Sequence, residues 1–167
     1  VDMATGFDTA TAEALKAFAA GGGRVVLHRP TPDQQPALEA LLGIRLRFLP
    51  VAQEPADSQY HAFRRSNDGL LAGISNHEFL WASAACFKEI RHEGCWWSWY
   101  NCPPEEFIAD HLCLPADADA DRAVRLTRPG GLLQVPAGNG YFLVNTLRLD
   151  APVADVAVTV SRLRSLL

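Results

Sequence analysis

A serine, a histidine and a glutamate follow one another closely after a short apolar run in the middle of the chain. Gly73-Ile74-Ser75-Asn76-His77 has the outline of the turn on which hydrolases hold a nucleophilic serine. Such a mechanism would use Ser75 as nucleophile, a histidine as base and Glu78 to orient that histidine. However, His77 stands where the tight turn needs a small residue, and Ser75 and Glu78 also have the spacing of a helix capping box. We favour the capping interpretation.

The serine hydrolase interpretation stays open as an alternative. A direct pairing of Ser75 with His77 is geometrically awkward because the two positions are so close in the chain. A more distant histidine would then have to approach, and the candidates are His61, His92 and His111.

Aromatic residues gather in one stretch, Trp96-Trp97-Ser98-Trp99-Tyr100. Aromatic rings stack on sugar faces and anchor protein interfaces, so Trp97, Trp99 and Tyr100 are candidate binding residues. Large aromatic side chains are more often buried, which favours a small core beneath a loop. A carbohydrate-binding or protein-binding module is therefore a second alternative.

The four cysteines, Cys86, Cys95, Cys102 and Cys113, all fall in one middle segment. They suit either two disulfides in an oxidising compartment or four reduced thiols. An extracytoplasmic location is favoured only if disulfides form, and the localisation is otherwise open.

Metal binding is not predicted. The cysteines together with His92 and His111 include zinc-binding residue types, but they show no Cys-x-x-Cys or His-x-x-x-His spacing. The acidic run from Asp117 to Asp121 imitates the start of a calcium loop, yet Arg122 and Arg128 stand where that loop needs glycine and glutamate. We expect no metal and no other cofactor.

Length and charge restrict the protein class. The chain has 167 residues, 49% of them hydrophobic, which fits a single domain over residues 1–167. A net charge of −4 without a basic stripe gives no reason to expect a nucleic-acid partner. No apolar run approaches the roughly 18 residues of a membrane span. Because the chain opens Val1-Asp2-Met3, we interpret it as a segment of a larger protein.

Helices and strands alternate in the first third of the chain. A first helix begins at Asp8 or Thr9, and its expected core face is Ala12, Leu15, Phe18 and Ala19. A buried strand follows over Arg24 to Leu27. A second helix is predicted over Asp33 to Leu42, ending at Gly43, and a strand over Ile44 to Val51.

The last third predicts a short helix over Glu105 to Leu112 and then a hairpin. Its strands, Leu132 to Val135 and Tyr141 to Leu149, are joined through Pro136 to Gly140. A final helix follows Pro152 and runs to Leu167. The whole pattern predicts an α/β fold with a doubly wound, mainly parallel, flavodoxin-like or amidotransferase-like sheet, helices on both faces and a C-terminal hairpin.

In this order the pieces resemble class I glutamine amidotransferase-like domains, and more closely the degenerate, non-catalytic branch that includes ThuA-like domains and the trimerisation domain of beta-galactosidases. The resemblance is carried by these segments: Ala14-Leu15-Lys16-Ala17-Phe18, Gly23-Arg24-Val25-Val26-Leu27, Leu41-Leu42-Gly43, Leu71-Ala72-Gly73-Ile74, Glu78-Phe79-Leu80-Trp81 and Gly138-Asn139-Gly140-Tyr141-Phe142-Leu143-Val144.

The resemblance also shows what this chain lacks. In the catalytic family the turn after such a strand is a Gly-x-Cys-x-Gly elbow that holds the nucleophilic cysteine. Here the turn reads His28-Arg29-Pro30-Thr31-Pro32 and has no cysteine. The resemblance therefore implies a non-catalytic accessory or assembly domain of a larger, carbohydrate-active protein. Its expected partners are other domains of that protein, a second copy of the chain, or a carbohydrate.

Overall fold

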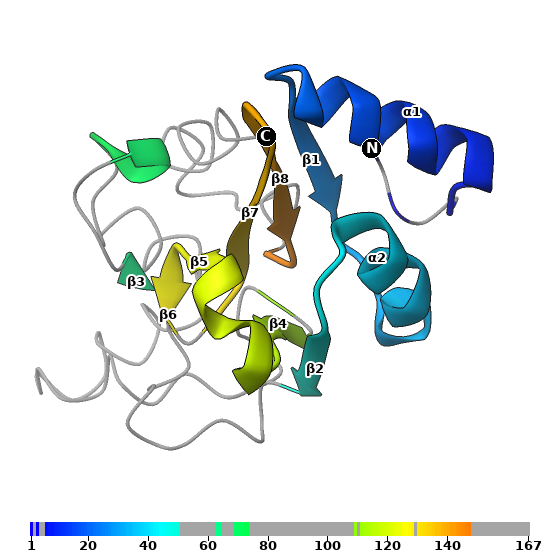
Figure 1. The fold of residues 1–167 in the computed structure, drawn as a ribbon. Coiled ribbons are helices and arrows are strands. Elements are labelled where there is room, and N and C mark those ends of the chain that lie inside the picture. Colours follow the sequence, from blue (N-terminus) through cyan, green and yellow to red (C-terminus); the bar gives the residue numbers. More distant parts are fainter. Residues whose placement is uncertain are drawn as a thin grey trace, which may run out of the picture.

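The computed structural model describes residues 1, 3, 6–50, 63–64, 69–73, 109, 111–128 and 130–147. These residues form an α/β structure, which confirms the predicted class (Figure 1). In chain order the elements are α1 (Thr9–Ala20), β1 (Arg24–His28), the 3-10 helix η2 (Pro32–Gln34), α2 (Gln35–Leu42), β2 (Leu46–Pro50), β3 (Phe63–Arg64), the 3-10 helix η5 (Gly69–Leu71), β4 (His111–Pro115), the 3-10 helix η8 (Asp117–Arg122), β5 (Val124–Arg125), β6 (Thr127–Arg128), β7 (Leu132–Ala137) and β8 (Gly140–Asn145).

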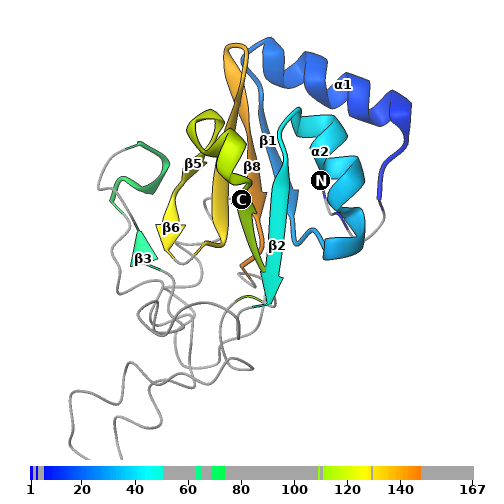
Figure 2. The ribbon, with the colours of Figure 1, turned by 60° about the horizontal axis from the view of Figure 1, so that its bottom comes forward.

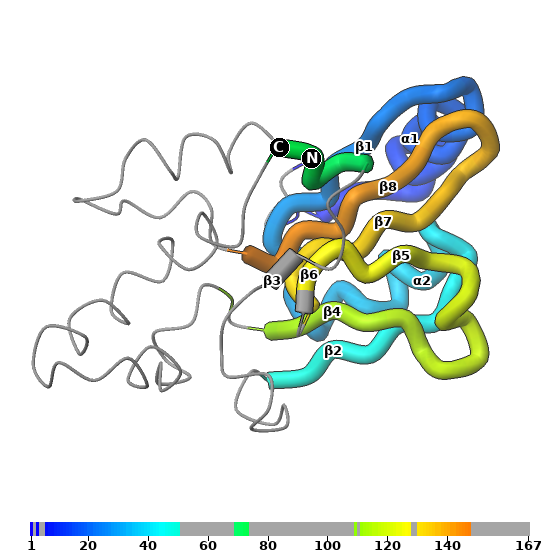
Figure 3. Tube along the Cα trace, turned by 90° about the vertical axis from the view of Figure 1, so that its left-hand side faces the viewer, coloured from blue at the N-terminus to red at the C-terminus, as the bar shows by residue number. Residues whose placement is uncertain are grey.

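The main sheet has the strand order β1-β8-β7-β5, and Figure 3 shows these strands side by side. β1 and β8 run parallel, whereas β7 is antiparallel to both β8 and β5. The β7–β8 pair is the predicted hairpin, turning at Gly138 and Asn139. The described sheet is therefore mixed, because the hairpin places an antiparallel strand next to β8.

Two smaller strand pairs accompany this sheet, β2 with β4 and β3 with β6, both antiparallel. β4 corrects the prediction of a helix ending at Leu112. His111 and Leu112 belong to β4 and pair with Pro50 and Leu49 of β2. Pairing with a distant strand overrides local helix preference here. The acidic run from Asp117 to Asp121 lies in the 3-10 helix η8.

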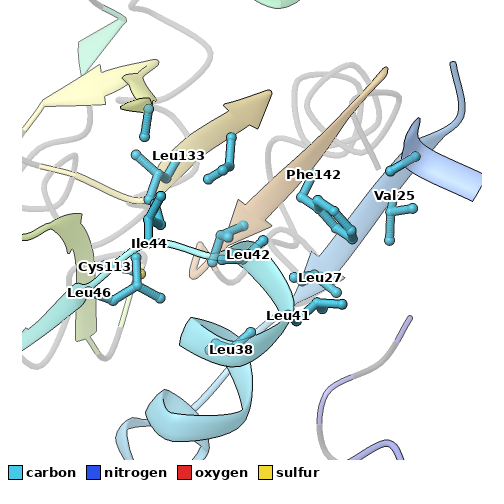
Figure 4. Packing of buried hydrophobic residues seen from close by; sticks show 14 of the residues in the cluster. Val25, Leu27, Leu38, Leu41, Leu42, Ile44, Leu46, Cys113, Leu133 and Phe142 are labelled. Carbon is cyan, nitrogen blue, oxygen red and sulfur yellow. The ribbon is translucent and has the colours of Figure 1, made fainter. Parts of the chain in front are cut away.

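Both α-helices lie on one side of the main sheet (Figure 2). The Asp8 side chain accepts a hydrogen bond from the Thr11 amide and so caps α1, as predicted. α2 ends at Gly43, whose φ of 67° lies in the left-handed region that favours glycine. Figure 4 shows Leu38 and Leu41 of α2 packing toward Leu27 in one buried layer.

Phe18 corrects the predicted core face of α1. Ala12, Leu15 and Ala19 pack on the core, but Phe18 remains 60% exposed. Its ring lies over Gly23, where a β-carbon would overlap it. Phe18 therefore covers the turn into β1 instead of entering the core.

Two leucines on the face of the sheet opposite the two helices are buried as well. Side chains alternate along a strand, so Leu132 and Leu143 point away from Leu133 and Val144, which belong to the core cluster beneath the helices. Leu132 and Leu143 are only 1% and 2% exposed. At Leu132 and Leu143, the β7–β8 hairpin is thus buried on this face too.

The predicted last helix lies outside the described residues. Within the described part of the chain, no helix has the length and apolar character needed to cross a membrane.

Candidate functional site

The residues that the sequence singled out for chemistry lie almost entirely outside the described part. This applies to Ser75, His77 and Glu78, to Trp97, Trp99 and Tyr100, and to the more distant His61 and His92. Their proposed roles stay predictions. Of the expected serine turn only Gly73 is described, with a φ of 78°.

A different polar site forms where β1 and β8 end. The two strands run parallel and in register, and their last residues, His28 and Asn145, are partners across the ladder. In open α/β sheets, ligands bind at the carboxyl ends of the strands. β4 begins with His111 at the same end of the molecule, so three strands deliver polar side chains to one place.

The corner that follows β1 is strained. Arg29 has a φ of 52°, which makes it the one non-glycine residue with a positive φ in the described part of the chain. Its amide donates a 2.7 Å hydrogen bond to the Asn145 carbonyl oxygen, which holds it in this conformation. A side chain in the left-handed region costs about 1–2 kcal/mol relative to an ordinary conformation, and such strain often accompanies functional sites.

The corner leads directly into a helix start. Thr31 precedes η2, and its amide donates to the side-chain oxygen of Gln34 at 3.0 Å. The amide group of that glutamine also donates to the Met3 carbonyl oxygen. The turn is therefore held by side-chain contacts on its helical side and by Asn145 on its strand side.

Asn145 is fully buried and joins the two strand ends through its side chain. Its Oδ1 accepts from the Leu147 amide at 3.1 Å, and its Nδ2 donates to the Leu147 carbonyl at 3.1 Å. The same Nδ2 lies 2.8 Å from Nδ1 of His28. Because the contacts with Leu147 fix Nδ2 as a donor, Nδ1 of His28 must accept and therefore carries no proton.

Next to this network is a small pocket of about 60 Å³, lined by Arg29, Pro30, Thr31, His111 and Thr146. Thr146 is 5% exposed, and its hydroxyl makes a long 3.4 Å hydrogen bond to the Gly131 carbonyl. The volume is about that of two water molecules. The lining offers a guanidinium, an imidazole and two hydroxyls, and no acidic side chain lines it within the described residues. This arrangement suits a small ligand rich in hydrogen-bond acceptors.

Cys113, the cysteine in the described part of the chain, does not take part in this site. Cys113 lies in the hydrophobic core as a free cysteine, and burial raises the pKa of its thiol to about 12. A thiol with such a pKa is protonated at neutral pH and is a poor nucleophile. Since Cys113 is free, two disulfides that use all four cysteines do not form, whereas the state of the other three lies outside the described residues.

A larger hollow of about 620 Å³ opens beside the end of α2, but its carboxylates serve the backbone. Glu39 accepts from the Leu46 amide at 2.9 Å, and Asp119 accepts from the Arg45 amide at 2.9 Å. These hydrogen bonds lower the pKa of each carboxyl. We therefore assign this hollow a structural role. No group of three potential metal ligands occurs among the described residues.

The turn at His28–Pro32 is visible in the sequence, but its polar partners are not. Asn145 and Thr146 were included in an apolar strand over Tyr141 to Leu149. The polar residues Asn145 and Thr146 at the end of an apolar strand could have indicated this site, because a buried amide side chain needs hydrogen-bond partners.

Comparisons of the chain with protein-family models, with curated proteins and with solved structures found no match.

Proposed function

We propose that this chain is a non-catalytic accessory or assembly domain of a larger, carbohydrate-active protein. The observation that carries the proposal is Arg29 at the positive-φ corner after β1. Amidotransferase-like domains, which the sequence resembles, place their cysteine nucleophile on such a corner. The guanidinium of arginine donates hydrogen bonds and offers no nucleophilic atom. The carbohydrate part of the proposal rests on the resemblance to the beta-galactosidase domain.

The proposal includes the finer fold: a doubly wound, mainly parallel sheet with helices on both faces. The parallel β1–β8 pair supports it, as does the burial of Leu132 and Leu143 on the face away from α1 and α2. In this arrangement β7 is the strand of the described sheet that runs opposite to β1, β8 and β5.

The test uses the natural reading frame that contains residues 1–167, expressed whole and without this segment. We expect both forms to cleave their sugar substrate with the same kcat per active site, since the segment supplies no reacting group. The shortened form should change its oligomeric state in sedimentation velocity or unfold at lower temperature. A reading frame with no catalytic neighbour, or loss of kcat with unchanged assembly, would contradict the proposal.

A second candidate function, binding of a small carboxylate, is favoured by the pocket at the strand ends. Its lining combines the positive charge of Arg29 with the hydroxyls of Thr31 and Thr146. Charged hydrogen bonds between arginine and a carboxylate are among the stronger polar contacts in proteins.

Sodium acetate followed by amide chemical shifts tests this second function. We expect saturable shifts at Thr31, His111 and Thr146, with affinity weakened about tenfold in Thr146→Val, which keeps the shape and removes one hydroxyl. Sodium chloride at equal ionic strength is the control. Equal shifts with both salts would contradict specific binding of a carboxylate.

A further inference from the structure

The last turn of α1 takes one of its hydrogen bonds from the β7–β8 hairpin. The final four carbonyl groups of an α-helix have no partner within the helix. In α1, the carbonyls of residues 17–19 accept from the amides of the glycines at 21–23 that follow. The fourth, that of Ala20, accepts at 3.1 Å from the amide of Asn139 at the tip of the hairpin. Figure 2 shows this tip beside the end of α1.

The tip also carries a pair of residues that can react with each other. Asn139 is exposed to solvent and is followed by Gly140, which has no β-carbon to keep its nitrogen away from the neighbouring side chain. The Gly140 nitrogen can bond to Cγ of Asn139 with loss of ammonia, which gives a five-membered succinimide. Water then opens the ring to aspartate, or to isoaspartate, in which the backbone continues through the former side chain. Water is the only co-reactant.

The folded hairpin opposes this reaction. Gly140 pairs with Ala137 across a two-residue turn. The Tyr141 amide points to the opposite side, where it donates to the Gly23 carbonyl at 3.2 Å. Because successive residues of a strand alternate in direction, the Gly140 amide is directed toward β7. Its nitrogen must lose its proton to attack Asn139, and the ladder retains that proton. The reaction therefore requires the turn to open.

We propose that Asn139–Gly140 is a self-modification site that deamidates through the succinimide when the hairpin tip opens, and that the product weakens the contact of the hairpin with α1. A β-carbon on Gly22 would lie 3.8 Å from that of Asn139, so the new carboxylate lies beside the carboxyl end of α1. The helix dipole disfavours a negative charge there. Isoaspartate also lengthens the turn and disturbs the pairing of Gly140 with Ala137. This inference does not depend on the proposed function.

Mass spectrometry of the whole chain tests the reaction. The protein is incubated at mildly alkaline pH in buffer and in urea, and the peptide that contains Asn139 is followed by its mass increase and its isoaspartate content. We expect reaction in both, slower in buffer by on the order of tenfold to a hundredfold, because the folded turn must first open. Asn145 is the internal reference, since Leu147 bonds its buried side chain and the branched Thr146 follows it.

Three results would overturn the proposal. One is an Asn139 that stays intact in buffer. Another is an equal rate in buffer and in urea, because the hairpin would then not control the reaction. The third is an Asn145 that reacts in buffer as fast as Asn139, because the reaction would then not depend on the exposed Asn139–Gly140 pair.

The effect of the product is measured with Asn139→Asp, which reproduces the aspartate form. Asn139→Ser is the matched control, because it removes the same side-chain amide without adding charge, and both variants keep the backbone amide that donates to Ala20. We expect the aspartate variant to melt about 2 °C below the serine variant at neutral pH, with a smaller difference at high salt. Equal melting temperatures would overturn the claim that the product weakens the contact.

Discussion

The two ends of the parallel β1–β8 pair are built from different chemistry. At the amino end of β1, glycines let backbone segments touch: a β-carbon on Gly140 would overlap the carbonyl oxygens of Gly23 and Ala19. At the carboxyl end the same strands finish in His28 and Asn145, beside the strained Arg29. The first end gains stability from close packing, whereas the second keeps buried polar groups and strain that packing alone does not require.

The hairpin turn illustrates how tight the amino end is. Gly138 has a φ of 58°, and a β-carbon there would lie 2.7 Å from the Ala20 carbonyl oxygen. The Asn139 amide donates to that same oxygen at 3.1 Å. The tip of the hairpin therefore docks on the end of α1, and neither glycine can be exchanged without moving backbone.

We expect the largest loss of stability from Gly140→Ala, which disrupts the close backbone packing at the amino end of the strand pair. Overlap with two backbone oxygens should lower the free energy of unfolding by about 3 kcal/mol in urea titrations. Gly21→Ala is the matched control, since a β-carbon there meets nothing closer than 3.5 Å. The control should change stability by less than about 0.5 kcal/mol. Similar losses in both variants would show that the close approach at Gly140 does not matter.

Asn145→Ala removes the buried side chain that contacts His28 and Leu147 at the carboxyl end of the strand pair. The buried Leu147 amide and carbonyl lose their partner, so we expect a loss of about 2 kcal/mol in the free energy of unfolding. His28→Ala and the double variant complete a cycle that isolates the contact between the two side chains. The coupling energy should be about 1 kcal/mol, and a value near zero would mean that the 2.8 Å contact adds no stability.

Arg29→Gly and Arg29→Ala separate the backbone strain at the carboxyl end from the chemistry of the side chain. Both variants lack the guanidinium, and only alanine keeps the β-carbon that disfavours a positive φ. We expect the glycine variant to be more stable by about 1 kcal/mol, the reverse of the usual order for these two residues. Calorimetric melting at equal pH measures the difference. A more stable alanine variant would show that the corner is unstrained.

The smallest effect concerns Asp119, remote from both strand ends. Hydrogen bonds from the Arg45 amide and the Arg122 side chain hold the pKa of this carboxyl below its ordinary value of 3.8. The folded state therefore gains stability from Asp119 above that value and loses it as the pH falls through the lowered pKa. Asp119→Asn should melt slightly lower than the parent at pH 7, with the difference shrinking below pH 4. An unchanged difference across this range would contradict the assignment.

The boundaries of the two α-helices and the hairpin were predictable because local signals define them. Asp8 caps α1, Gly43 ends α2, and the run Pro136 to Gly140 marks the hairpin. Phe18 and His111 were predicted wrongly because distant contacts decide their environments. Periodicity within one segment does not show that the Phe18 ring lies over Gly23. It also does not show that His111 pairs with β2.

The site was less predictable than the fold. His28 and Asn145 are separated by 117 positions, and only the register of β1 with β8 brings them together. The positive φ of Arg29 is equally invisible in the sequence, since arginine carries no preference for that conformation. The sequence did indicate that the turn lacks a cysteine.

If the chain is a non-catalytic domain, the corner after β1 supports no reaction. Stopped-flow measurement with an activated acetate ester, and with glutamine in a glutaminase assay, tests it most directly on the whole chain. We predict no burst and no turnover above buffer for the parent protein, and no change in Thr31→Ala or Ser75→Ala. A burst stoichiometric with protein that either substitution abolishes would contradict the account.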